Sequence, residues 1–154
     1  MLPLLNEERL KELVERVPPV PLKKSLLDMT CGEFIEAMDE GYVLRLLKAR
    51  RIVKALGRYR QYLSELEIIT NYMKRYEVAQ TSEEKAAAQG VAFPSIGERI
   101  LVESVRHYHL HSTAEAEKLP LADWLLCFKD EGSKAQYQHR LSEIQSKKNG
   151  TRKR

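Results

Sequence analysis

The sequence has few of the residues that build covalent or metal-held frameworks. Its 154 residues include only two cysteines, Cys31 and Cys127, which lie far apart. Two cysteines are too few for a disulfide framework or a cysteine-based zinc knuckle, and they favour a reducing environment. The seven glycines are isolated from one another, so the glycine-rich loops that bind phosphate are excluded as well.

Long apolar runs and regular alternation are also missing. No apolar stretch approaches the roughly 20 residues that a membrane-spanning helix needs, and no charged-then-apolar signal segment opens the chain. Hydrophobic residues make up 43% and charged residues 31% of the chain, a balance typical of a globular protein, and we expect no membrane partner. Because strand-like alternation of apolar and polar residues is absent, we expect no β-sheet.

The sequence does contain a series of helix-start signals. In a capping box, a Ser or Thr side chain and the side chain of a Glu three residues later each accept a hydrogen bond from an otherwise unpaired backbone N–H. The pattern occurs at Thr30–Glu33, Thr81–Glu84, Ser95–Glu98 and Ser112–Glu115. Asn6, which two acids follow, gives a fifth start. The chain is therefore predicted to be all-α.

One helix is predicted to be much longer than the others. From Leu46 to Tyr76 apolar residues recur every three or four positions. This spacing indicates a single helix over about residues 43–76, roughly 50 Å long, which Gly57 could bend. The expected fold is an irregular bundle of five to seven helices around this long helix, without a sheet.

Another helix with one apolar face is predicted in the C-terminal part of the chain. It consists of Leu121, Trp124, Leu125 and Phe128, spaced as one face of a helix. We expect this helix to break near Gly132. Residues 1–146 are predicted to form a single helical domain, which opens with a helix and a proline-rich connector over residues 1–22. Residues 147–154 are predicted to be a disordered basic tail.

Positive charge is concentrated in two segments. Residues 41–60 contain no acid and seven basic residues, which we call the basic stripe: Arg45, Lys48, Arg50, Arg51, Lys54, Arg58 and Arg60. The chain after Glu143 adds five more basic residues. These twelve exceed the net charge of +4, so the rest of the molecule is acidic overall. The basic stripe could bind nucleic-acid phosphates, pair with an acidic partner, or remain a solvated helix face.

One histidine cluster has the spacing of metal ligands. Glu103, His107 and His111 lie at i, i+4 and i+8, where one helix face could present them to a zinc or nickel ion. The alternative, which we prefer, is that the histidines interact with the negative end of the helix dipole. No histidine lies close to Cys31 in sequence, and no glycine-rich elbow frames a serine. We therefore predict neither a cofactor nor an enzymatic activity.

Two segments resemble proteins of phages and mobile elements. The run YHLHSTAEAEKLPLADWLL, Tyr108–Leu126, is similar to the C-terminal arrangement of small helical phage-tail assembly chaperones and related prophage accessory proteins. The run SLLDMTCGEFIEAM, Ser25–Met38, is similar to the lead-in segment of small proteins from mobile elements of gut bacteria, some of which bind DNA. The resemblance implies a location in the bacterial cytoplasm or with a virion, and it transfers no functional residue.

The length of the predicted helix 43–76 favours an interaction role. A globule of this size spans only about 30–35 Å, so a helix of roughly 50 Å must bend or project toward a partner. The leading prediction is a non-enzymatic helical adaptor or assembly protein that binds a protein partner or a second copy of itself. The alternative is a nucleic-acid-binding accessory protein that uses the basic stripe and the basic tail.

Overall fold

The computed structural model describes residues 7–48, 51–78 and 82–151 and is helical almost throughout. The helices are α1 (Glu7–Arg16), α2 (Cys31–Ala37), α3 (Glu40–Leu47), α4 (Ile52–Tyr76), α5 (Ser82–Ala87), α6 (Ile96–Tyr108), α7 (Thr113–Ala116) and α8 (Leu121–Thr151), with a 3-10 turn η1 (Leu26–Asp28). Within the described ranges the only β-type pairing is an isolated bridge between Thr30 and Pro120, which confirms the all-α prediction. None of the described helices is both long and apolar enough to cross a membrane.

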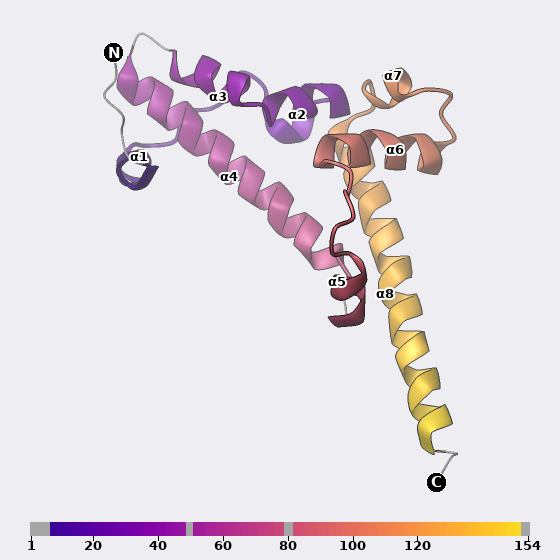
Figure 1. Cartoon of the computed structure of the whole chain (residues 1–154). Coiled ribbons are helices and arrows are strands. Elements are labelled where there is room, and N and C mark those ends of the chain that lie inside the picture. Colours follow the sequence, from indigo (N-terminus) through magenta and orange to yellow (C-terminus); the bar gives the residue numbers. More distant parts are fainter. Residues whose placement is uncertain (1–6, 49–50, 79–81, 152–154) are drawn as a thin grey trace.

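The two longest helices, α4 and α8, organise the molecule (Figure 1). Helices α1 and α3 pack against α4, and α6 packs against the beginning of α8. The C-terminal part of α4 meets α8, and η1 contacts both helices. Beyond this meeting point α8 continues away from the other helices toward the C-terminus, as Figure 1 shows.

The hydrophobic core lies where η1, α2, α4, α6 and α8 meet. Its largest fully buried side chains include Trp124, Phe34, Leu26 and Ile69. The predicted apolar stripe of Leu121, Trp124, Leu125 and Phe128 is buried in this core, as expected. Leu63 and Leu66 of α4 are half-buried and pack against the same cluster.

Helix caps determine where several helices begin. The capping boxes predicted at Thr30 and Ser95 form completely, with both reciprocal hydrogen bonds present. The Ser112 hydroxyl accepts a hydrogen bond from the backbone N–H of Glu115, and so starts α7. The starts predicted at Asn6 and Thr81 lie outside the described residues.

The prediction of one helix over residues 43–76 is wrong, because this segment contains two helices. α3 ends at Leu47, and α4 begins at Ile52 after Arg51, whose backbone is extended. α3 packs back against α4, so that the ring centroids of Tyr42 and Tyr62 are 5.7 Å apart. Two amphipathic helices that pack on each other have the same apolar spacing as one long helix, which explains the error.

Gly57 lies inside α4, and its missing side chain allows another segment to approach closely. The backbone N–H of Val20 donates a hydrogen bond to the Gly57 carbonyl at 3.0 Å. A Cβ atom on Gly57 would lie only 2.6 Å from a Val20 methyl group and 2.7 Å from the Pro18 carbonyl oxygen. The proline-rich connector therefore crosses α4 at this glycine.

The predicted break near Gly132 is wrong, and the part of the predicted tail that the structure describes, residues 147–151, is helical. α8 runs without interruption from Leu121 to Thr151, and residues 152–154 lie outside the described part of the chain. At Gly132 the end of α4 approaches so closely that an added Cβ would overlap the Tyr76 carbonyl oxygen and lie 2.9 Å from the Tyr76 Cβ. The glycine therefore permits helix contact and does not end the helix.

Candidate functional site

The three residues weighed as candidate metal ligands, Glu103, His107 and His111, are not brought together. α6 ends at Tyr108 and His109 adopts the left-handed conformation, so His111 leaves the helix face on which Glu103 and His107 lie. Both carboxylate oxygens of Glu103 already accept hydrogen bonds. One accepts them from the Arg99 guanidinium, and the other accepts one from the indole N–H of Trp124. The shared helix face on which the metal hypothesis depended is therefore absent.

His107 instead faces two acids of α8. Its Nδ1 lies 3.5 Å from the Glu131 carboxylate, and one ligand atom each from His107, Asp130 and Glu131 lie within 4.8 Å of one another. The Lys134 ammonium already binds Asp130 and lies 3.6 Å from Glu131. These acids thus have a cationic partner within their own helix, and we assign no metal to the cluster.

Both cysteines are core residues. Cys31 and Cys127 are almost completely buried, and burial raises the pKa of each thiol to about 11. At neutral pH a thiol with this pKa is almost entirely protonated, and the thiolate is the nucleophilic form. Neither cysteine is therefore poised as a catalytic nucleophile.

The described residues of the basic stripe do not all lie on one surface. Arg60 donates hydrogen bonds to the backbone carbonyls of Glu15 and Val17 and so caps the end of α1. Arg58 precedes it by two residues on α4, so the two side chains leave the helix on opposite sides. Arg45 lies over the Tyr42 ring, 5.8 Å from its centroid.

The remaining members of the basic stripe lie near the junction of α3 and α4. Lys48, Arg51 and Lys54 are exposed, and Arg50 lies outside the described residues. A continuous surface for nucleic-acid phosphates would need these residues and Arg58 and Arg60 to share one face. The structure places Arg60 at a helix cap, away from that face, whereas Arg58 lies in a cleft one turn along α4 from the exposed Lys54.

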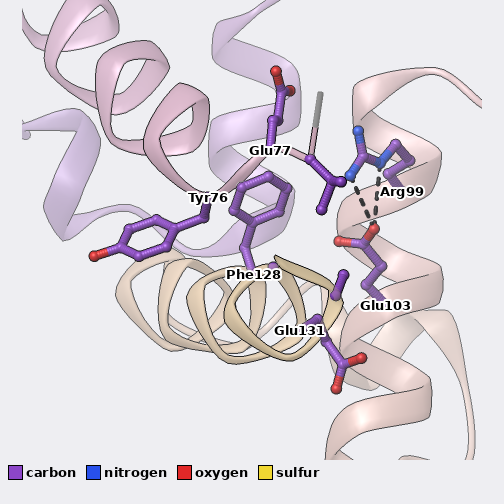
Figure 2. A pocket seen from close by; sticks show the side chains of 9 residues that line it. Tyr76, Glu77, Arg99, Glu103, Phe128 and Glu131 are labelled. Atoms are coloured by element: carbon purple, nitrogen blue, oxygen red, sulfur yellow. Dashed lines mark hydrogen bonds and ion pairs between the residues drawn. The ribbon is translucent and has the colours of Figure 1, made fainter. Parts of the chain in front are cut away.

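A cleft of about 630 Å³ opens between the end of α4, α6 and α8 (Figure 2). The Arg99 guanidinium lies 5.5 Å from the centroid of the Phe128 ring and binds Glu103. Glu131, at the edge of the cleft, pairs with His107 and Lys134. Because these charged groups already have partners, the cleft is better explained as a gap between packed helices than as a reaction site.

The distal half of α8, residues 137–148, carries an exposed apolar stripe. Tyr137, Leu141 and Ile144 are 67%, 41% and 52% exposed and lie at i, i+4 and i+7 on one side of the helix. The amide of Gln136 donates to the Arg75 and Glu77 carbonyls, where α8 passes the end of α4. Beyond this point the helix extends away from the other helices (Figure 1).

One structural residue escaped the sequence reasoning. The Glu65 carboxylate is buried and accepts hydrogen bonds from the Ser25 hydroxyl, the Leu26 backbone N–H and the Gln61 amide at 2.7–2.8 Å. It thereby holds η1 against α4. The sequence does indicate that Glu65 is buried, because it lies between Tyr62 and Ile69 at the spacing of the apolar face.

Comparison with known proteins adds no assignment. No protein-family model, no curated protein and no solved structure matches this chain. The functional proposals therefore rest on the sequence and on the geometry of the described residues.

Proposed function

We propose that this protein is a non-enzymatic helical assembly protein that binds a second copy of itself through the distal half of α8. The observation that supports this most directly is the exposed apolar stripe of Tyr137, Leu141 and Ile144 on a helix segment that extends away from the core. A partner helix that covered the stripe would gain about 25 cal/mol for each Å² of apolar surface removed from water.

The helix in this segment has little support from the rest of the described chain. Side-chain pairs within the helix contribute, as between Lys134 and Asp130 and between His139 and Glu143. Such exposed pairs add only about 0.2–0.5 kcal/mol each, and isolated helices of about 12–15 residues are marginal in water. A second helix against the stripe would supply the missing stabilisation.

The charge pattern favours an antiparallel second copy. Tyr137, Leu141 and Ile144 follow the three-and-four spacing of a coiled-coil seam, which Lys134 and then Asp130 continue toward the N-terminus of the helix and Lys148 continues toward its C-terminus. With Tyr137 opposite Leu141 of the second copy, Asp130 comes opposite Lys148 of that copy. In a parallel pair each Lys148 would instead lie beside the other, and like charges would repel.

We expect the purified chain to sediment as a dimer, at about twice the chain mass of 17.8 kDa, at a concentration of about 100 µM. The double substitution Leu141→Glu/Ile144→Glu places two charges in the seam and should give a monomer with unchanged core stability. The matched control is Ser142→Glu/Ser146→Glu, which adds the same charge at exposed positions on the side of the helix opposite the stripe. Sedimentation equilibrium of the three proteins decides the matter, and a seam variant that remained dimeric would refute the proposal.

Nucleic-acid binding remains the second candidate, supported by the exposed patch of Lys48, Arg51 and Lys54. Three phosphate contacts would give a slope of log K against log salt of only about −2.7 on duplex DNA. Such a patch supports weak, sequence-independent binding at most. For this reason we rank assembly through α8 first.

A further inference from the structure

A second cleft, of about 440 Å³, lies where the segment before η1 meets α2, α3 and α4. Four cationic side chains line it: Lys23, Lys24, Arg45 and Arg58. Two of them belong to the basic stripe, and the two lysines directly follow the proline-rich connector. The fold thus gathers positive charge from three separate segments into one concave site.

Most of this positive charge has no partner in the described part of the chain. Lys24 binds Glu33, which also completes the Thr30 capping box. Among the residues that the structure describes, no carboxylate lies within ion-pair distance of Lys23, Arg45 or Arg58. With Glu33 and Glu36 also on the lining, the cleft keeps an excess of positive charge.

The Arg58 side chain, which lines the cleft, carries a hydrogen-bond donor without an acceptor. Its Nε is shielded from solvent and has no hydrogen-bond acceptor. A buried donor without an acceptor is destabilising. An anionic group placed in the cleft would pair with the Arg58 guanidinium, which lines the cleft without a carboxylate partner, and guanidinium groups bind phosphate and carboxylate oxygens well.

The rest of the lining is apolar and aromatic. Met29 and Leu46 contribute apolar surface, and the Tyr42 ring lies beside them with the Arg45 guanidinium over its face. Apolar walls with a few placed polar groups are typical of small-molecule sites, and the volume lies within their usual range of about 300–1,000 Å³.

We propose that this cleft binds a small organic phosphate, with the phosphate oxygens at Arg58 and Arg45 and an aromatic or apolar body against Tyr42, Met29 and Leu46. The inference is independent of assembly through α8. A nucleic-acid strand fits the site less well, because Glu33 and Glu36 on its lining would repel a continuous row of phosphates.

The test is isothermal titration of the full-length protein with ADP, inorganic pyrophosphate and adenosine at low ionic strength. We expect ADP to bind, pyrophosphate to bind more weakly because it lacks the aromatic body, and adenosine not to bind. Arg58→Met should weaken ADP binding about ten- to a hundredfold, because it removes a hydrogen bond to a charged group. The melting temperature of unliganded Arg58→Met should equal or exceed that of the native chain, because the unpaired donor is gone.

Two further variants complete the test. Arg51→Met makes the same change on an exposed residue outside the cleft and should leave ADP binding unchanged. Lys23→Met, at an exposed position on the cleft, should weaken binding even if Arg58→Met does not fold. The proposal is overturned if ADP produces no saturable heat, if Arg51→Met weakens binding as much as the cleft variants do, or if mixed-sequence DNA binds more tightly than ADP.

Discussion

Replacing Trp124 by alanine is expected to lower the free energy of unfolding by about 3–5 kcal/mol, the largest effect of any single substitution considered for this chain. Trp124 is fully buried, and its ring centroid lies 5.5 Å from that of Phe128. The substitution also removes the indole N–H that binds Glu103. The substitution therefore weakens the packing of α6 against α8.

The measurement is thermal and chemical denaturation followed by circular dichroism. For a chain of this size the loss corresponds to a fall in melting temperature of roughly 10 °C. Trp124→Phe is the control, because it keeps most of the apolar volume and loses only the hydrogen bond, and it should cost clearly less. An unchanged melting temperature in Trp124→Ala would contradict the burial of this face.

Substituting Gly132 by alanine should destabilise the protein by about 1–3 kcal/mol, although alanine favours helices. In a helix whose glycine makes no close contact, the same change would stabilise by about 1 kcal/mol. Here a Cβ would overlap the carbonyl oxygen of Tyr76, and a backbone atom cannot rotate away. The contact between α4 and α8 would have to open.

Whether Gly132→Ala lowers or raises the free energy of unfolding shows whether the close approach of α4 or helix propensity dominates at this position. Ser133→Ala, at the neighbouring exposed position, should change the unfolding free energy by no more than about 0.5 kcal/mol. Urea denaturation of both variants and the native chain measures the difference. A more stable Gly132→Ala would show that helix propensity dominates and that the close approach of α4 is not required.

Local signals in the sequence predicted a large part of the fold. The caps at Thr30, Ser95 and Ser112 and the apolar face around Trp124 depend on residues three or four positions apart, whose geometry a helix fixes. Features that depend only on residues within one helix turn could therefore be predicted from the sequence.

Features that depend on contact between helices could not be predicted in this way. Gly57 and Gly132 suggested a bend and a break, yet each marks a close approach by a segment distant in sequence. The pairing of His107 with Glu131 joins two helices, and no spacing within α6 reveals it. The division of residues 43–76 into α3 and α4 likewise depends on how the two halves pack.

The central claim, antiparallel pairing of two copies through the distal half of α8, is tested most directly by disulfide formation between variants that each carry one added cysteine. Tyr137→Cys and Leu141→Cys place thiols at exposed positions, while the native Cys31 and Cys127 are buried. Antiparallel pairing brings position 137 of one copy beside position 141 of the other, and a disulfide needs Cα atoms within about 7 Å. We predict that an equimolar mixture oxidises to a covalent dimer faster than either variant alone. Equally fast crosslinking of Leu141→Cys by itself, or no crosslinking in the mixture, would contradict the account.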